Sequence, residues 1–346
     1  MMKYALVTGG CGFIGSNFVH QIIESGEFHP VILDKLSYAG SLSNLSSLNK
    51  GEYTFIKGDI CDEVLVNNLF EKYKFASVFH FAAESHVDRS IDGPKDFINT
   101  NIIGTFNLLQ VVRNNLANMH SAFKFIHVST DEVYGDLNEG EYFKETTPYN
   151  PSSPYSASKA SSDHLVKSWG RTYGLPVIIT NCSNNYGPFQ FPEKLIPLMI
   201  INCLGWKPLP VYGDGENVRD WLHVIDHCSA IKAVYDTGKL HETYNIGGNN
   251  EIKNIEIVHS ICNILNKIKP SENGDYKKLI KFVDDRPGHD FRYAIDSSKI
   301  QKNLDWKPKE SFESGIAQTI NWYIKNEKWW KNIQEKKYNQ ERLGRI

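Results

Sequence analysis

Cysteine is scarce in this sequence, and the six cysteines it has are scattered rather than grouped. None forms a Cys-x-x-Cys pair or stands at zinc-ligand spacing, so we predict neither a disulfide framework nor a metal site. We interpret the cysteines as reduced, small apolar residues of a cytoplasmic protein. They are Cys11, Cys61, Cys182, Cys203, Cys228 and Cys262.

Long hydrophobic runs and an excess of charge of either sign are also missing. No apolar stretch is long enough to span a bilayer, and the opening MMKYALVTGG enters a strand-like run without the features of a signal peptide. The 38 basic and 40 acidic residues leave a formal net charge of -2. This balance predicts no general affinity for nucleic acid or for an anionic membrane.

The first half of the chain alternates short β-branched runs with helical stretches, which is typical of a parallel sheet with crossover helices. The expected strands are Tyr4–Val7, Val31–Asp34, Tyr53–Lys57, Val78–Phe81, Phe125–Val128 and Val177–Thr180. The expected helices are Ile14–Ser25, Val64–Tyr73, Pro94–Asn115 and Pro154–Tyr173.

After Asn181 the pattern loosens, and we expect a smaller α/β lobe behind a Rossmann-type, doubly wound parallel sheet. Residues 1–183 would form the larger domain and residues 184–346 mainly the lobe, with a strand near 243–246 returning to the sheet. The charged last twenty residues, with Trp329 and Trp330, would be either a solvated tail or a flap over the site. The expected later helices are Pro192–Leu204, Asp226–Thr237, Asn254–Ile268 and Phe312–Lys325.

A glycine-rich turn joins the first expected strand to the first expected helix. Gly9, Gly12 and Gly15 permit a tight turn, close approach of a pyrophosphate to the backbone and close helix–strand packing. Asp34, at the end of the next strand, can bind both ribose hydroxyls and would repel a 2′-phosphate. The pattern predicts a nicotinamide dinucleotide in the larger domain and favours NAD over NADP, although the adjacent Lys35 weakens that preference.

Asp59-Ile60 ends the third expected strand, where it suits an adenine contact; an Asp that starts a turn is the alternative.

Tyr155 and Lys159 lie four residues apart on one face of an expected helix. We expect the ammonium to lower the pKa of the phenol and make it a usable base.

An acidic loop follows the strand that ends near Val128. Thr130 can hydrogen-bond a sugar hydroxyl, and Asp131 and Glu132 are adjacent carboxyl groups. Two carboxyl groups in different surroundings can divide into an acid and a base. A solvated acidic turn is the alternative for an isolated pair of this kind.

The chain resembles the extended short-chain dehydrogenases, and within them the nucleotide-sugar dehydratases that convert dTDP-glucose. The resemblance rests on TGGCGFIGS, STDEVYGD, PSSPYSASKASSDH, TNCSNNYGPFQFPEKLIPL, YGDGENVRDWLHV and DDRPGHDFRYAID, among other segments along nearly the whole chain. It implies transient oxidation at carbon 4 by bound NAD, loss of water across carbons 5 and 6, and return of the hydride to carbon 6. The expected product is a nucleotide 4-keto-6-deoxy sugar.

The resemblance also implies roles for individual residues. Tyr155, helped by Thr130 and Lys159, would take the proton of the 4-hydroxyl as the hydride passes to NAD. Glu132 would take the proton of carbon 5, and Asp131 would protonate the leaving hydroxyl. The further cofactor positions are Phe13, Ile14, Asp59, Ile60, Ala82, Ala83, Thr100 and Asn185, beside Gly9, Gly12, Gly15, Asp34, Lys35, Tyr155 and Lys159. The substrate positions are Ser85, Thr130, Asn184, Lys194, Leu195, Pro210, Tyr212, Arg219, Asn254, Arg286, His289 and Tyr338.

Several alternatives stay open. The same reaction on a UDP- or GDP-linked hexose, a 4-epimerase or decarboxylase, and a non-catalytic NAD-binding scaffold all fit the cofactor motif. Asp131 argues against epimerase and decarboxylase, since neither reaction expels the 6-hydroxyl. His86 is either catalytic or, as we prefer, a hydrogen-bonded structural residue. The segment 94–115 and the helix with Tyr155 would pair across a two-fold axis in a homodimer, or pack internally instead.

Overall fold

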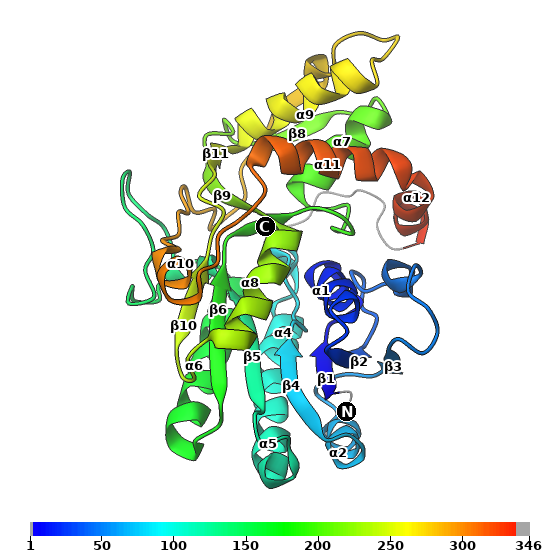
Figure 1. Cartoon of the computed structure of the whole chain (residues 1–346). Helices are drawn as coiled ribbons and strands as arrows, with labels where there is room; N and C mark the ends of the chain where they lie inside the picture. The colour runs from blue at the N-terminus through cyan, green and yellow to red at the C-terminus, as the bar shows by residue number, and fades with distance from the viewer. Residues whose placement is uncertain (1–2, 337–346) are drawn as a thin grey trace.

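The computed structural model describes residues 3–336 and confirms the expected α/β class. Seven strands form one sheet in the order β10-β6-β5-β4-β1-β2-β3, and every pairing is parallel (Figure 1). The direction of winding reverses between β1 and β4, which is where open α/β sheets bind their ligands. The strands are β1 Lys3–Thr8, β2 Phe28–Asp34, β3 Thr54–Lys57, β4 Phe75–His80, β5 Lys124–Thr130, β6 Val177–Cys182 and β10 Thr243–Ile246.

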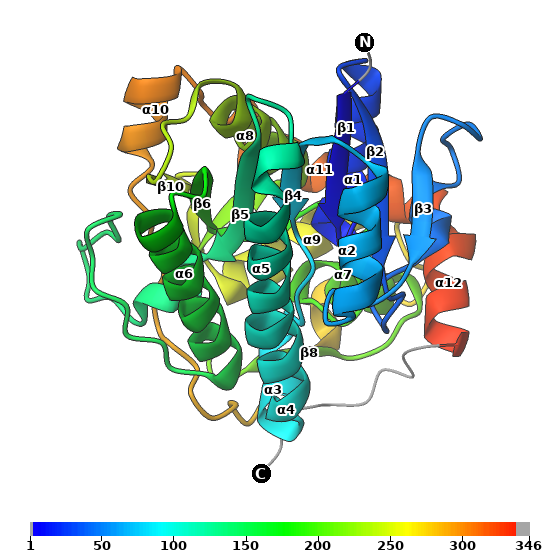
Figure 2. The same ribbon diagram turned by 90° about the horizontal axis from the view of Figure 1, so that it is seen from below.

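Helices cover both faces of this sheet, so its central strands are buried on both sides and read as continuous apolar runs. One face carries α1 (Phe13–Glu24) and α8 (Val224–Thr237), which pack against each other. The other face carries α2 (Glu63–Lys72), α5 (Thr105–Asn115) and α6 (Pro154–Tyr173), which lie side by side in Figure 2. A separate apolar cluster fills each side.

The expected long helix over 94–115 is interrupted. It consists of α4 (Pro94–Phe97), a π-helical segment η2 (Ile98–Gly104) and then α5. Gly104 contacts Ile60 so closely that an added Cβ would lie 2.5 Å from its Cδ1 atom. Single π turns are frequent at functional sites, and this one holds Thr100 and Asn101 beside α6.

The smaller lobe sits at the carboxyl ends of the central strands (Figure 1). Its core lies among α7 (Leu195–Leu204), α9 (Asn254–Ile268) and α11 (Phe312–Lys325). The start of α7 is three residues later than expected, because Pro192 and Glu193 form a turn. Five short strands were not expected: β7 Asn184–Tyr186, β8 Leu209–Tyr212, β9 Val218–His223, β11 Glu251–Lys253 and β12 Ile280–Val283.

Near its end the described chain forms helix α12 (Glu327–Lys336), which is packed rather than solvated. Trp330 is buried, and the Trp329 indole donates a hydrogen bond to Asn44 Oδ1 at 2.8 Å. The prediction of a solvated tail is therefore wrong for this segment. The remaining helices are α3 Val87–Asp92 and α10 Ser298–Leu304. Within residues 3–336 no helix has both the length and the apolar character needed to cross a membrane.

Candidate active site

A cavity of about 440 Å³ opens where the carboxyl ends of the central strands meet the smaller lobe. Every predicted cofactor, catalytic and substrate residue that the structure describes lies in its wall. Tyr338 lies outside the described residues. The structure thus brings together side chains that are far apart in the sequence, while the role of each stays a prediction.

The glycine turn fits a dinucleotide for steric reasons. Gly9 has φ +71°, and a Cβ on it would lie 2.7 Å from the backbone nitrogen of Ala82. A Cβ on Gly15 would lie 2.2 Å from the carbonyl oxygen of Gly9. These glycines let the chain turn tightly into α1, whose N-terminal N–H groups then face the cavity as an anion site.

Asp34 and Lys35 differ in their surroundings. Asp34 Oδ2 accepts a hydrogen bond from the Cys11 backbone at 2.9 Å, which fixes the carboxylate beside the glycine turn. Lys35 Nζ donates to Thr100 Oγ1 at 2.8 Å and lies 3.1 Å from Glu84 Oε1. Because Lys35 is held by these partners, it does not offset Asp34, and the pair favours NAD over a 2′-phosphorylated dinucleotide.

The sequence left two interpretations open for Asp59 and two for His86. Both residues line the cavity, and both also have structural partners. Asp59 Oδ1 accepts a hydrogen bond from the Cys61 backbone at 2.9 Å, so it does start a turn. His86 caps α3 by accepting the Arg89 backbone N–H, and burial holds the pKa of its imidazole well below the usual value. A neutral, capping His86 agrees with the structural interpretation.

The helix of Tyr155 and Lys159 starts at a capping box formed by Ser153 and Ser156. Lys159 Nζ donates to the carbonyl of Val128 at 2.9 Å. The expected low pKa of Tyr155 is wrong for the described protein. Burial, and then the nearby Glu132, raise the pKa of the Tyr155 phenol well above its ordinary value.

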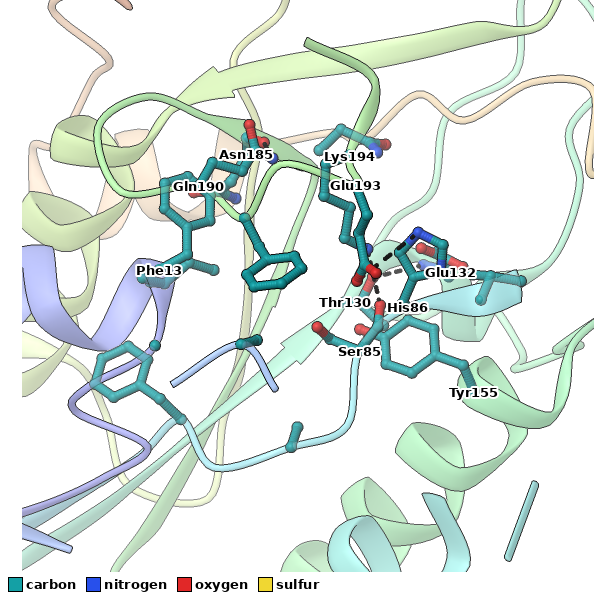
Figure 3. Close-up of a pocket in the computed structure, with 18 of the residues that line it drawn as sticks. Phe13, Ser85, His86, Thr130, Glu132, Tyr155, Asn185, Gln190, Glu193 and Lys194 are labelled. Carbon is teal, nitrogen blue, oxygen red and sulfur yellow. Dashed lines mark hydrogen bonds and ion pairs between the residues drawn. The ribbon is translucent and has the colours of Figure 1, made fainter. Parts of the chain in front are cut away.

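Asp131 and Glu132 begin a short 3-10 turn directly after β5, and the Thr130 hydroxyl caps this turn. Figure 3 shows Thr130 and Glu132 near Tyr155 in the pocket. Thr130 Oγ1 also donates to Asp131 Oδ1 at 3.4 Å. Burial raises the pKa of both carboxyl groups, and Glu132 raises that of Asp131 further. Nearby Arg286 and Lys194 partly offset the effect of burial on Glu132. The turn therefore suits one carboxyl group as a proton donor and its neighbour as a base.

Cationic side chains line the lobe side of the cavity. Lys194 Nζ donates to the Ser85 carbonyl at 3.1 Å, and Arg219 donates to backbone carbonyls at residues 218, 290 and 291. Arg286 Nε lies 3.3 Å from Asp88 Oδ1, while its buried Nη1 has no hydrogen-bond partner among the described residues. An unpaired buried guanidinium nitrogen fits a phosphate oxygen.

Sequence reasoning missed several residues of the wall. Glu193 Oε2 accepts a hydrogen bond from Arg89 Nε at 2.9 Å, and the Arg89 guanidinium lies 3.9 Å above the Tyr38 ring. Tyr293 also lines the cavity, with Arg219 over its ring. Glu193 immediately precedes Lys194 in the segment that carried the resemblance, so its position was the available signal.

Comparison with known proteins agrees with this geometry. Residues 6–319 match the family model described as GDP-mannose 4,6 dehydratase. The chain is 55% identical to a dTDP-glucose 4,6-dehydratase of Neisseria meningitidis and 53% identical to one of Escherichia coli, over 99% of both chains in each pair.

Solved structures give the same result. The crystal structure of a dTDP-glucose 4,6-dehydratase from Bacillus anthracis in complex with NAD is 48% identical, with a TM-score of 0.86 over 96% of this chain and 99% of that one. A UDP-glucose 4-epimerase from Thermotoga maritima is 30% identical, with a TM-score of 0.84 over 93% and 99%.

Proposed function

Because this chain belongs to the GDP-mannose 4,6 dehydratase family, and within it to the dTDP-glucose 4,6-dehydratases, we propose that it converts dTDP-glucose to dTDP-4-keto-6-deoxyglucose. The observation that carries this proposal is the adjacent pair of a buried Asp131 and a partly buried Glu132, which shares one cavity wall with Tyr155 and the glycine turn. Elimination of water needs an acid and a base beyond the one that serves oxidation, and this wall supplies them.

The glycine turn, Asp34 and Lys159 would hold NAD, which when bound accepts a hydride from carbon 4 of the sugar and returns it to carbon 6. Tyr155 takes the proton of the 4-hydroxyl. A positively charged oxidised nicotinamide would oppose the effect of burial on the Tyr155 pKa. Thr130 and Lys159 orient the phenol and the sugar oxygen on the same face of the cavity.

Elimination is assigned to the acidic turn. Glu132 removes the proton of carbon 5, which the 4-keto group has acidified, and Asp131 protonates the departing 6-hydroxyl. The raised pKa of Asp131 supports this division because it favours a carboxylic acid that still holds its proton near neutral pH. Glu132 has cations nearby that favour its ionised form.

The protons balance only if the site resets after each turnover. Glu132 returns its proton to carbon 5 as the hydride reaches carbon 6. Tyr155 then ends with an added proton, and Asp131 ends without the proton that left in the water. The Thr130 hydroxyl donates to Asp131 Oδ1 and lies in the same cavity wall as Tyr155. We assign to this hydroxyl the path that returns the proton from Tyr155 to Asp131.

The nucleotide is proposed from the relatives. The matching family model carries a GDP-mannose description, but the relatives at 53–55% identity over 98% or more of the chain are dTDP-glucose enzymes. Identity at that level favours dTDP-glucose over UDP- or GDP-linked sugar. A 4-epimerase remains the second candidate, favoured only by a structural likeness at 30% identity.

The test is to incubate the purified protein with dTDP-glucose, UDP-glucose and GDP-mannose in turn, without added reductant. We expect a product lighter by one water from dTDP-glucose, formed at least ten times faster than from either other sugar. An epimer, or unreacted dTDP-glucose, would refute the proposal. Product from GDP-mannose alone would refute the choice of nucleotide.

A homodimer is also proposed, through the exposed apolar side chains of the segment 94–115 and of α6. Ile98, Ile103, Phe106 and Tyr173 are each about 40–49% exposed on this surface. Sedimentation analysis should give a dimer that Phe106→Arg weakens.

A cytoplasmic location is proposed as well, supported by the six cysteines, which form no disulfide in the structure.

A further inference from the structure

A fully buried carboxylate outside the cavity wall joins three segments of the chain to the catalytic helix. Asp163 lies one turn after Lys159 on α6, and its side chain is 0% exposed. Its Oδ2 accepts hydrogen bonds from Ser129 Oγ at 2.9 Å, from Tyr149 OH at 2.9 Å and from Asn181 Nδ2 at 3.3 Å. No step of the mechanism above uses this group.

His127 of β5 supplies the fourth partner, with its Nε2 atom 3.1 Å from Asp163 Oδ1. Burial lowers the pKa of His127, so this imidazole is neutral near pH 7. Burial alone would raise the pKa of Asp163, but hydrogen bonds from His127 and Ser129 and the charge of Lys159 bring it below its ordinary value. Asp163 is therefore a buried anion whose Oδ2 atom accepts three hydrogen bonds, while its Oδ1 atom has the His127 ring nearby but no hydrogen-bond partner among the described residues.

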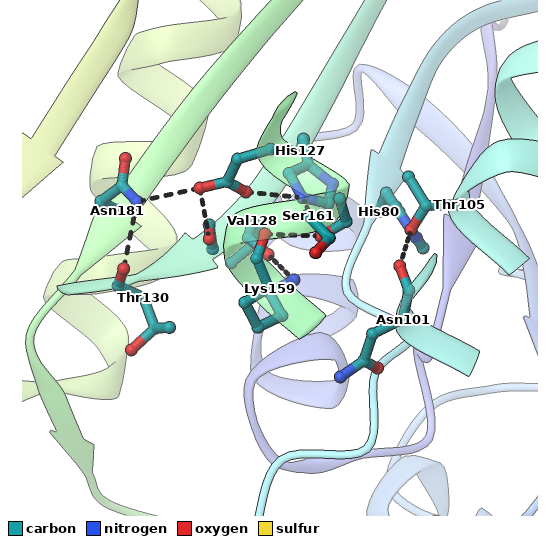
Figure 4. Close-up of polar contacts among 12 residues, drawn as sticks. His80, Asn101, Thr105, His127, Val128, Thr130, Lys159, Ser161 and Asn181 are labelled. Carbon is teal, nitrogen blue, oxygen red and sulfur yellow. Dashed lines mark hydrogen bonds and ion pairs between the residues drawn. The ribbon is translucent and has the colours of Figure 1, made fainter. Parts of the chain in front are cut away.

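These contacts end at the residues that lead into the acidic turn. Ser129 immediately precedes Thr130, and Asn181 Nδ2 also donates to the Thr130 carbonyl at 3.0 Å. Lys159 Nζ binds the carbonyl of Val128, one residue before Ser129. Figure 4 shows Asn181, Thr130, Val128 and Lys159 in this arrangement. The hydrogen bonds of Asp163 thus connect α6 with the carboxyl ends of β5 and β6, directly before the Thr130-Asp131-Glu132 turn.

We propose that Asp163 is a positioning residue, which holds the Thr130-Asp131-Glu132 turn against the helix of Tyr155 and Lys159 and stabilises the Lys159 ammonium with its charge. The inference rests on the proposed function. A merely structural carboxylate would affect folding only, whereas a positioning residue affects turnover and its pH dependence.

The charge relation can be tested because few charged groups shift the pKa of Lys159, which shares a helix face with Tyr155. Burial lowers the pKa of Lys159, and Asp163 on the same helix is the main group that raises it, followed by Cys182 of β6. His127 of β5 and His80 of β4 face the same space, and burial holds the pKa of both imidazoles below the usual value. Without the Asp163 charge, Lys159 should lose its proton at a lower pH.

The experiment measures the pH dependence of product formation by NAD-loaded, full-length Asp163→Asn with dTDP-glucose. We expect kcat to fall about tenfold or more, with KM within about twofold, and the alkaline limb of the profile to move down by roughly one pH unit. The limb moves down because activity requires charged Lys159, which is lost earlier as pH rises. A wild-type kcat and limb would overturn the inference.

Two further variants complete the test. Asp226→Asn is the matched control, since Asp226 is a buried carboxylate of α8 that accepts a backbone N–H from Glu310 and lies outside the cavity wall. It should leave the alkaline limb in place, and an equal shift would overturn the inference.

If Asp163→Asn fails to fold, Ser129→Ala is the second variant, because it keeps the charge of Asp163. It should lower kcat without moving the alkaline limb; an unchanged kcat or a moved limb counts against the proposal. Wild-type protein that forms no product refutes the proposed function instead.

Discussion

Asp131 and Asp163 are carboxyl groups of the same residue type, both fully buried, on adjacent elements of the fold, yet their surroundings are opposite. Asp163 Oδ2 accepts three hydrogen bonds, His127 Nε2 lies 3.1 Å from its Oδ1, and its pKa lies below the ordinary value. Asp131 receives one long hydrogen bond from Thr130, and its Oδ2 has no partner among residues 3–336. Burial, reinforced by Glu132, raises its pKa well above the ordinary value.

The difference shows that burial alone does not decide the charge of a carboxyl group; the number of donors aimed at it does. Behind the helix, donors from β5, β6 and a loop keep Asp163 ionised and rigid. At the cavity, burial and the charge of Glu132, with few donors to offset them, raise the pKa of Asp131 and favour the protonated form that can give up a proton. A poorly satisfied buried group costs stability, and active sites commonly retain that cost for the sake of chemistry.

The largest expected effect is on chemistry at the cavity. Asp131→Asn cannot protonate the leaving hydroxyl, so we expect product formation to fall by about 10²–10⁴-fold. Oxidation of carbon 4 does not need this proton, so enzyme-bound NADH should accumulate, as measured by its absorbance in a stopped-flow experiment. If NADH fails to form at all, the division of roles between Tyr155 and Asp131 is wrong.

Next in size is the stability supplied by Asp163. Because its folded pKa is depressed, its contribution is present above the unfolded value of about 3.9 and is lost as pH falls through the folded value. Asp163→Asn should therefore lower the free energy of unfolding by about 2–4 kcal/mol at pH 7. Urea titrations should show equal deficits at pH 7 and pH 5 and a smaller one as the pH falls below about 3.9, and a deficit that stays constant down to the lowest pH would contradict a charged Asp163.

This contrast also separates what the sequence predicted from what it did not. The glycine turn, the Tyr155 and Lys159 pair and the acidic loop were all found, because each depends on residues within a few positions of one another. The parallel arrangement of the main sheet followed from the alternation of strands and helices. Functional residues that lie close together in the chain can be recognised from a short sequence motif.

What could not be predicted depends on partners distant in the sequence. Asp163 in the segment SSDH has no feature that separates it from a solvated Asp, since its donors lie 14 to 36 residues away. The pKa of Tyr155 was predicted in the wrong direction for the same reason, because burial and then Glu132, 23 residues earlier in the chain, raise it. The π segment and the three-residue strands β7 and β11 likewise arise from tertiary packing rather than local propensity.

A smaller effect, of opposite sign, is expected at Asp131. Its raised pKa means that the unfolded chain ionises at a lower pH than the folded protein, so stability falls as pH rises above about 4. Asp131→Asn cannot ionise and should be more stable than wild type by about 1–2 kcal/mol at pH 7. Denaturant titrations should show this gain vanish near pH 4; a loss of stability at pH 7 would mean that Asp131 is better satisfied than its contacts indicate.

The smallest change is expected at Ser129, which belongs to both regions because its side chain donates to Asp163 while its backbone leads into Thr130. Ser129→Ala removes one donor and leaves those from Tyr149 and Asn181 in place. The free energy of unfolding should fall by about 0.5–1 kcal/mol, toward the lower end for a buried hydrogen bond because the carboxylate stays largely satisfied. Calorimetry with the neighbouring Ser158→Ala, whose hydroxyl instead accepts from Asn101, provides the comparison. If Ser129→Ala slows turnover several-fold and Ser158→Ala does not, a change in the hydrogen bonding of Asp163 alters the position of the acidic turn. If both variants slow turnover equally, Asp163 has no specific effect on Asp131.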